Sequence, residues 1–337
     1  MAEDAGYDAA DDGYDDGYDA AYDDGYGAPR RRRPWRRVLV GVLALAVVGG
    51  LVVWLNRDKL APPAEGCKVT TAAGSGTLEL PQAANAATIT AVAMARGLPE
   101  RAVTISLATA IQESKLHNLA GGDRDSVGLF QQRPSQGWGS VDQIMDPVYS
   151  TDKFLDALVK VNGYAQMPLT DAAQQVQRSG YPQAYAKHED NAALLASVLT
   201  GREPAALDCV VHALPAPVPT DPTEPAPTAA NLSDRVRREF GKAVTVAGAE
   251  KAAKDPREVL ALTPQPTAST AGAGGAGQTG WALAHWSVAQ AAALGIGQVA
   301  YDGRVWRVDR PGQGWKPLAG APSDRVLVTL GEPVKGK

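Results

Sequence analysis

The stretch from Gln112 to Pro134 reads QESKLHNLAGGDRDSVGLFQQRP. Glu113 ends an apolar segment whose residues recur at helical spacing, and a loop rich in Gly and Gln follows it. An enzyme that cleaves polysaccharides needs a positioned carboxyl group to protonate the glycosidic oxygen. The stretch therefore makes Glu113 the candidate catalytic acid, although a helix end also commonly carries an exposed structural Glu.

Helical patterns continue on both sides of this stretch, and no alternating strand pattern interrupts them between residues 80 and 201. Pro99 suits the first position of the helix that leads to Glu113. These patterns predict a mainly α domain over residues 80–213. Its other helices are expected at residues 83–97, 140–145, 149–161, 171–178 and 183–199.

The Glu113-Ser114 pair, together with Gly128-Leu129-Phe130-Gln131 and Pro134, resembles the soluble lytic transglycosylase family. That family carries a Glu-Ser pair followed by Gly-Leu-Met-Gln and a nearby Pro. The resemblance implies a goose-type lysozyme-like fold and cleavage of the MurNAc-GlcNAc bond of peptidoglycan. We expect no cofactor and no metal. Glu113 would protonate the leaving oxygen and then, as a base, assist formation of a 1,6-anhydro sugar. Ser114 would support Glu113, and Gln131 would contact the acetamido region of the sugar.

Further substrate-binding candidates lie around this motif. The family's later Tyr-Asn-Ala-Gly motif falls on Gln177-Arg178-Ser179-Gly180, where only the Gly matches, so Tyr181 or Tyr185 would have to substitute. Trp138 either stacks on a sugar or serves as a core aromatic. The complete set of substrate-binding candidates is Ser114, Gly128, Gln131, Gln132, Trp138, Tyr181 and Tyr185.

Two aspartates of the loop are candidates for a second carboxylate. Asp123 and Asp125 could support direct hydrolysis by inversion, which uses two carboxyl groups. The alternative is that they cap or solvate the loop.

Charge is unevenly distributed along the chain, whose formal net charge is −4. Residues 1–29 carry ten acidic side chains and no basic ones, and six Arg follow within the basic flank at residues 30–37. Subtracting these from the totals of 37 acidic and 33 basic residues leaves 27 of each sign in the rest of the chain. The neutral C-terminal part argues against a nucleic-acid-binding protein.

The uncharged run at residues 38–55 predicts one transmembrane helix in the lipid bilayer, because it would span about 27 Å. The Arg flank on its N-terminal side would keep residues 1–29 in the cytoplasm and send the rest outside, after a linker at residues 56–79. A cleaved signal peptide is the alternative. The Asp-Gly-Tyr repeats of residues 1–29 cannot bury a core. This tail would either dock a cytoplasmic partner or kinase, or remain solvated.

The chain has two cysteines, Cys67 and Cys209, on either side of the predicted helical domain. Outside the membrane they would form a disulfide. The alternative is two unrelated buried thiols. Neither the cysteines nor the four histidines have the spacing of a metal site.

Beyond a Pro-rich linker at residues 214–230, the sequence predicts a small α+β domain over residues 231–337, interrupted by a Gly/Ala-rich linker at residues 263–280. Helices are expected at 232–240 and 281–294, strands at 243–247 and 325–330, and a hairpin at 298–308 that turns at Asp302-Gly303. The region from Trp281 to Trp306 resembles a domain appended to secreted actinobacterial wall proteins. It implies a non-catalytic module, either for wall binding or for stability alone.

The predicted fold class is thus a mainly α lysozyme-like domain outside a single transmembrane helix, plus a small C-terminal α+β domain. The Ala, Gly, Arg and Pro bias is typical of a GC-rich actinobacterial source. Three functions stay open: a membrane-anchored lytic transglycosylase facing the cell wall, a non-catalytic peptidoglycan-binding anchor, and a lysozyme-type hydrolase.

Overall fold

A computed structural model of the chain describes residues 35–55, 63–215, 228–251, 258–265 and 275–331. Contacts divide the chain into two compact units, residues 1–61 and 62–337, which are described separately. The predicted acidic tail, four Arg of the basic flank and most of the Pro-rich linker lie outside the described residues.

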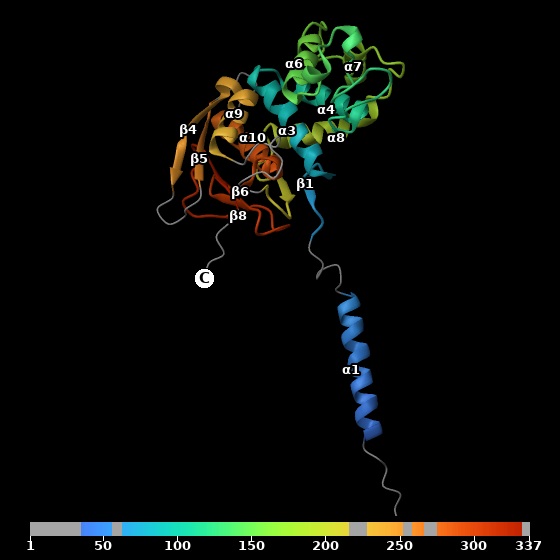
Figure 1. Ribbon diagram of the computed structural model, residues 1–337, viewed down its shortest axis with the longest axis vertical. Helices are drawn as coiled ribbons and strands as arrows, with labels where there is room; N and C mark the ends of the chain where they lie inside the picture. Colours follow the sequence, from blue (N-terminus) through green and yellow to red (C-terminus); the bar gives the residue numbers. More distant parts are fainter. Residues whose placement is uncertain (1–34, 56–62, 216–227, 252–257, 266–274, 332–337) are drawn as a thin grey trace, which may run out of the picture. The chain divides into compact units, whose positions relative to one another are not determined.

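In the first unit, helix α1 spans Trp35–Leu55 (Figure 1). The part of α1 whose side chains are described without a break runs from Val38 to Val52, and these side chains are exposed. Within the described residues, no helix combines the length and the apolar content that crossing a membrane requires. The predicted transmembrane helix at residues 38–55 is therefore corrected.

The second unit begins with a three-stranded antiparallel sheet in the order β2-β1-β3. Strands β1 (Gly66–Thr71) and β2 (Gly74–Leu78) form a hairpin, and β3 (Leu207–Val210) pairs with β1 from far along the chain. The hairpin lies within the region predicted as a linker at residues 56–79, which is a correction to that prediction. Cys67 faces Cys209 across the β1 and β3 pair, and the two form the expected disulfide.

Six helices lie between these strands, close to their predicted positions: α3 (Leu80–Ala95), α4 (Glu100–Ser114), α5 (Val141–Ile144), α6 (Pro147–Leu158), α7 (Leu169–Gln177) and α8 (Glu189–Leu199). Capping residues and prolines at the helix ends explain why the sequence predicted these positions. Asp146 caps α6 by accepting a hydrogen bond from the Val148 amide at 3.0 Å, and Pro147 occupies the first turn. Helices α3 and α4 are buried along most of their length and form the centre of this part.

The C-terminal part contains a six-stranded antiparallel sheet in the order β4-β5-β9-β6-β7-β8. Its strands are β4 (Val244–Lys251), β5 (Glu258–Pro264), β6 (Ile296–Tyr301), β7 (Arg304–Arg307), β8 (Lys316–Pro317) and β9 (Val326–Leu330). Three helices accompany it: α9 (Ala229–Phe240), α10 (Gly275–Ala289) and α11 (Ala291–Leu294). The hairpin turns at Asp302-Gly303 as predicted, with both residues at positive φ.

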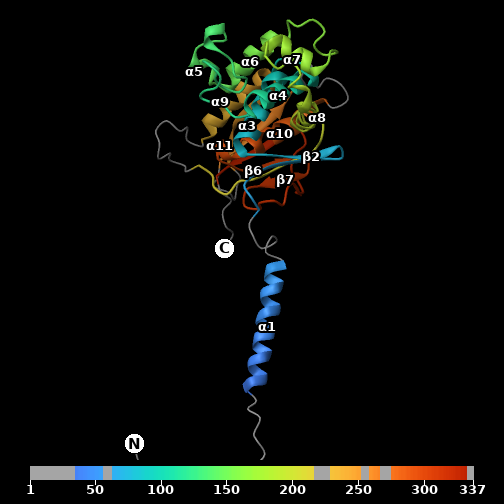
Figure 2. The same cartoon turned by 90° about the vertical axis from the view of Figure 1, so that its right-hand side faces the viewer.

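Strand β5 was not predicted, and both β5 and α10 extend into the predicted Gly/Ala-rich linker at residues 263–280. Helix α10 packs between the sheet and α3 (Figures 1 and 2). The residues predicted as two domains therefore share one hydrophobic core.

Side-chain hydrogen bonds join the C-terminal part to α8, β3 and the residue before β3. Strand β3 accepts two of them from the C-terminal part: Trp306 Nε1 donates to Asp208 Oδ1 at 3.0 Å and Trp315 Nε1 donates to the Leu207 carbonyl at 2.8 Å. His285 of α10 lies 2.8 Å from the Val198 carbonyl through Nδ1, and its Nε2 accepts from the Ala206 amide at 3.2 Å. The predicted fold class is wrong, because helices and two antiparallel sheets form a mixed α+β fold in one compact unit.

Candidate functional site

Glu113 lies in the last turn of α4, half-buried, and its Oε1 accepts a hydrogen bond of 2.6 Å from the Tyr185 hydroxyl. Lys115 and Leu116 follow in the left-handed region at φ 54° and 63°, so the chain turns away sharply after Ser114. Tyr185 is fully buried. Burial, and then the hydrogen bond to Glu113, raise the pKa of Tyr185 far above its usual range, so the phenol remains a hydrogen-bond donor to the carboxyl group.

Ser114 is buried and does not line the cavity that contains Glu113. Its Oγ lies 2.7 Å from the Leu129 carbonyl and 3.0 Å from the Ala110 carbonyl, so its hydroxyl hydrogen can be shared between them. This contact connects the loop around Leu129 to the end of α4, next to Glu113.

Gly128 shapes this loop rather than binding in the cavity. Its φ is +79°, and a Cβ there would lie 2.8 Å from the Ile144 carbonyl oxygen, so a side chain would clash with backbone. Its amide donates to the Leu119 carbonyl at 2.7 Å, which connects the loop to the segment after α4. Glycine is therefore required at this close approach.

The side-chain amides of Gln131 and Gln132 form hydrogen bonds within the protein. Gln131 Oε1 accepts from Ser126 Oγ at 3.0 Å, and its Nε2 donates to the Gly128 carbonyl at 3.1 Å. Gln132 is buried and donates to the Ser150 carbonyl at 3.0 Å. Both line the cavity, but their amides also hold the loop in place.

The cavity beside Glu113 has a volume of about 610 Å³. The predicted residues Glu113, Asp123, Gln131, Gln132, Trp138 and Tyr181 all line it, although they come from separate segments. Ser114, Gly128, Asp125 and Tyr185 lie outside its lining. The lining residues that sequence reasoning did not select are Arg124, Ser126, Arg133, Gln136, Gln177, Arg178, Ser179 and Gly180.

The two loop aspartates differ in their surroundings. Asp125 pairs with Arg133 Nε at 2.7 Å and accepts from the Ser135 amide at 2.8 Å. The Arg133 hydrogen bond, followed by that of Ser135, holds the pKa of Asp125 well below its usual range. The Asp123 side chain is 94% exposed, and its nearest cation, Arg124, is 4.0 Å away. Asp123 is therefore the aspartate with access to a substrate in this cavity.

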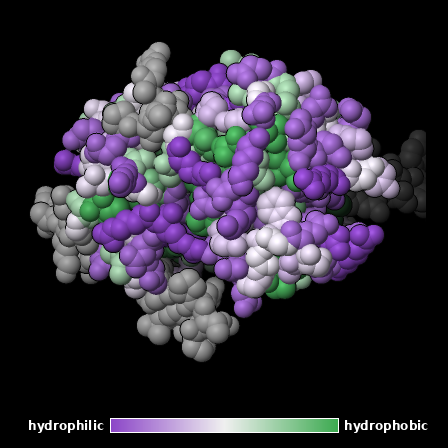
Figure 3. All heavy atoms as spheres, turned by 90° about the horizontal axis from the view of Figure 1, so that it is seen from above, coloured by the Kyte–Doolittle hydropathy of each residue, from purple (hydrophilic) through white to green (hydrophobic). Residues whose placement is uncertain are grey.

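A second cavity of about 750 Å³ adjoins the first, because both are lined by Gln136, Trp138, Gln177 and Arg178. We call the two together the groove. Trp138 lies at their junction, half-buried, and its carbonyl accepts from the Tyr149 hydroxyl at 3.3 Å. Its ring therefore contacts the groove as well as the core. The molecular face that carries α6 and α7, seen from above, is predominantly hydrophilic (Figure 3).

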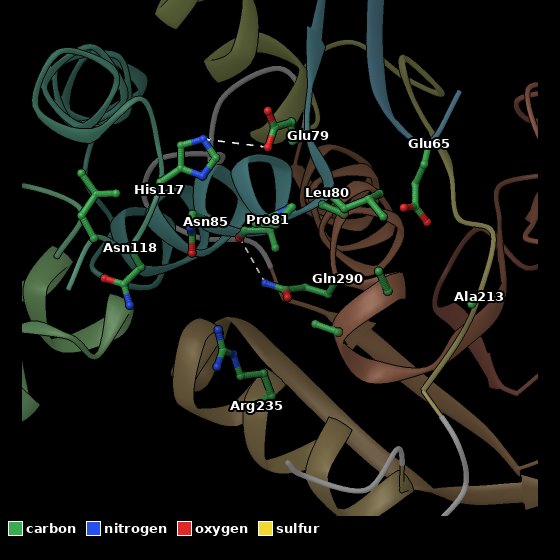
Figure 4. Close-up of a pocket in the computed structure, with 15 residues that line it drawn as sticks. Glu65, Glu79, Leu80, Pro81, Asn85, His117, Asn118, Ala213, Arg235 and Gln290 are labelled. Carbon is green, nitrogen blue, oxygen red and sulfur yellow. Dashed lines mark hydrogen bonds and ion pairs between the residues drawn. The ribbon is translucent and has the colours of Figure 1, made fainter. Parts of the chain in front are cut away.

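A larger cavity of about 1120 Å³ lies elsewhere, between α3, the segment after α4, α9 and α11 (Figure 4). At its wall the Gln290 side chain donates to the Ala84 carbonyl at 3.2 Å, and His117 lies 4.0 Å from Glu79. Glu113 does not line this cavity. Volume alone is therefore a poor guide to the chemistry, and we assign the candidate site to the groove.

Among the residues that the structure describes, no cluster of three or more His, Cys, Asp or Glu side chains could hold a metal ion. His188 lies 3.0 Å from Gln112 Oε1 through Nε2, and His285 is enclosed by backbone groups. The candidate site thus consists of Glu113, its Tyr185 donor and the polar groove.

Comparison with known protein families gives a match in the C-terminal part of the chain. A family model described as the VldE C-terminal domain matches residues 223–326. The match spans helices α9 to α11 and most of the large sheet, and it does not include Glu113. No curated protein matches the chain.

Proposed function

We propose that this protein cleaves the glycan strands of peptidoglycan at the MurNAc-GlcNAc bond, with Glu113 as general acid and base. The single observation that carries the proposal is the 2.6 Å hydrogen bond from Tyr185 to Glu113, whose carboxyl group lines a polar groove. The phenol engages Oε1 from the protein side. Oε2 then remains for a glycosidic oxygen in the groove.

The reaction that fits this arrangement is a lytic transglycosylation. Glu113 would give its proton to the bridging oxygen as the bond from the sugar C1 to that oxygen breaks. The carboxylate would then take the proton of the C6 hydroxyl of the same sugar while O6 bonds to C1. The product is a 1,6-anhydro sugar, no water is consumed, and Glu113 ends protonated as it began.

The two loop aspartates support this choice over direct hydrolysis. Hydrolysis with inversion needs a second carboxylate that activates water on the opposite face of the sugar. Asp125 does not line the cavity and is paired with Arg133, and Asp123 is largely solvated. A transglycosylase needs neither, because one carboxyl group serves both steps.

Tyr185 also bears on the family resemblance. The motif position at Gln177 to Gly180 lacks the tyrosine of the family, whereas Tyr185, a few residues later, supplies a phenol to Glu113. We propose that Tyr185 takes over the positioning of the acid.

The location of the protein is part of the proposal. A disulfide between Cys67 and Cys209 is favoured in oxidising compartments, which supports a place outside the cytoplasm, facing the cell wall. We propose that the C-terminal part, which packs on α3 and β3, has no catalytic role of its own. The cytoplasmic partner or kinase of residues 1–29 stays a prediction.

The test is incubation of the full-length protein with purified peptidoglycan, followed by mass spectrometry of the released fragments. We expect 1,6-anhydro muropeptides from the wild type, their loss in Glu113→Gln by a factor of about 100 to 10,000, and their retention in Asp123→Asn. Products that contain added water, together with loss of activity in Asp123→Asn, would identify a hydrolase. Equal release by Glu113→Gln and the wild type would exclude Glu113 as the acid.

One observation favours a second candidate, a non-catalytic peptidoglycan-binding protein. Arg178 lines the groove where the family motif has Asn, so one wall differs from that of the resembling enzymes. Binding to purified wall with no released fragments, equal in the wild type and Glu113→Gln, would establish this alternative.

A further inference from the structure

The end of the groove beyond Trp138 has a positive charge that the cleavage reaction does not need. Its lining is Gln136, Trp138, Ala157, Lys160, Val161, Asn162, Gln175, Val176, Gln177 and Arg178. This described lining contains two cations and no carboxylate. Lys160 and Arg178 are exposed, and neither forms an ion pair within the described part of the chain. Two uncompensated cations beside one cavity favour an anionic ligand.

The backbone of Arg178 is held in one conformation by its neighbours. Arg178 ends α7 in the left-handed region at φ 49°, a conformation that is unfavourable for residues other than glycine. The surroundings hold it there: its amide donates to the Gln174 carbonyl at 2.8 Å, and the Gln174 side chain donates to the Ser179 carbonyl at 2.8 Å. These contacts fix the point at which the Arg178 side chain leaves the end of α7, where the residue lines both cavities.

The same loop is attached to the catalytic part of the groove. Gln177 Nε2 donates to the Phe130 carbonyl at 2.8 Å, which joins the end of α7 to the loop that contains Gln131. Gln177 and Arg178 line both cavities. A ligand that lies along the groove past Glu113 and Trp138 would therefore place its next units beside Arg178 and Lys160.

We propose that Lys160 and Arg178 form a carboxylate-binding subsite that recognises the acidic groups carried by muramic acid residues of the strand. This inference rests on the proposed function and adds to it a basis for selectivity: neutral β-1,4-linked chains of GlcNAc would fill the groove without satisfying the two cations. The carboxylates have two sources, the lactyl group of a peptide-free strand and the stem peptide of a substituted one. Arg178 can bind a carboxylate through two parallel N–H groups, whereas Lys160 contributes a single charge.

The test measures binding to full-length Glu113→Gln, which prevents turnover, with three probes of equal length. These are a neutral chitooligosaccharide, a peptide-free glycan strand and a peptide-bearing strand. We expect both strands with carboxylates to bind about threefold to tenfold more tightly than the chitooligosaccharide at low salt, with a difference that shrinks as salt is added. Preference for the peptide-free strand alone would assign the lactyl carboxylate, and preference for the peptide-bearing strand alone would assign the stem peptide. Preference for both strands would show that the subsite accepts either carboxylate.

Adding Lys160→Gln and Arg178→Gln should remove this preference while leaving chitooligosaccharide binding unchanged. The matched control, Lys68→Gln with Arg310→Gln, removes the same charge at exposed positions that do not line the groove and should keep the preference. Lys160→Gln alone, which leaves the strained residue intact, should reduce it partly. Equal binding of all three probes, or a preference that survives both groove substitutions, overturns the inference.

Failure of this inference and failure of the proposed function give different results. Release of anhydro products by the wild type without a charge preference would overturn the subsite alone. A charge preference without any release of products would overturn the cleavage reaction and leave the subsite standing.

Discussion

The Tyr185 hydroxyl lies 2.6 Å from Glu113 Oε1, although 72 residues separate them in the chain. Glu113 lies in the last turn of α4, and Tyr185 directly precedes the short 3-10 helix Ala186–His188 that leads into α8. The pair joins a buried phenol to a half-buried acid and defines which oxygen of the carboxyl group faces the groove. Several expectations depend on this contact and on the packing that produces it.

Tyr185→Phe should lower kcat for release of peptidoglycan fragments by about tenfold to a hundredfold, because Glu113 loses the donor that orients it. The phenyl ring keeps the burial, so KM and the thermal midpoint should change little. Tyr164→Phe is the matched control, since Tyr164 lines neither cavity of the groove. Steady-state kinetics would contradict the positioning role if both variants retained the wild-type kcat.

The disulfide should contribute strongly to stability because it closes a long loop, with a sequence separation of 142 between Cys67 and Cys209. Replacing both with Ser should lower the free energy of unfolding by about 2 to 5 kcal/mol. Urea unfolding with and without a thiol reductant checks this. The reductant should destabilise the wild type by a similar amount and leave the double Ser variant unaffected.

Gly201 should tolerate no side chain, because α10 crosses directly over it. A Cβ there would lie 2.0 Å from the Gln278 carbonyl oxygen and 2.4 Å from the Ala282 amide nitrogen. Gly201→Ala should therefore cost more than about 3 kcal/mol in unfolding free energy, since backbone atoms must move.

Gly163→Ala is the control for the backbone strain alone. Gly163 also has a positive φ, +71°, but no atom lies within 4 Å of its Cβ position. Its substitution should cost only about 1 to 2 kcal/mol. Equal losses in the two variants, measured by urea denaturation, would show that α10 does not press on Gly201.

His285 should make the fold less stable in mild acid. Burial lowers its pKa to about 4, against about 6.5 in an unfolded chain, and its Nε2 accepts a backbone hydrogen bond that a protonated ring cannot accept. The unfolded state therefore binds more protons between these values. Buried neutral His285 makes its full contribution to the free energy of unfolding above about pH 6.5. That contribution falls by on the order of 3 kcal/mol as the pH decreases toward 4.

His285→Gln isolates this effect from other titrating groups, because Gln can donate to the Val198 carbonyl and accept from the Ala206 amide without a charge change. Unfolding free energies should be measured for both proteins from pH 7 to pH 4. The wild type should lose more stability than the variant across this range. Parallel curves would show that the histidine does not carry the pH dependence.

Elements with local signals were predictable. The α4 helix with Glu113 at its end, the stop of α11 at Gly295 and the turn at Asp302-Gly303 all depend on residues within a few positions of one another. The cysteine pairing was also predictable, since only two cysteines exist.

Strands β1, β2 and β5 were missed for a common physical reason. Their pairing depends on segments far away in the chain: β1 pairs with β3, β2 pairs with β1 at the edge of the same sheet, and β5 pairs with β9. A short strand gains its stability from such pairing and from burial, neither of which its own residues reveal. The same reasoning explains the separate domains that were expected where Trp306, Trp315 and His285 join one core.

The stretch from Gln112 to Pro134 by itself determined the candidate acid and the presence of a loop beside it, because helix periodicity, a terminal carboxyl group and glycine positions are written in adjacent residues. Only the tertiary structure decided that Tyr185 is the donor to Glu113, that Asp123 rather than Asp125 faces the groove, and that Lys160 and Arg178 extend it. These relations join side chains from separate helices and loops. They arise when a shared core brings those segments together, so no local pattern contains them.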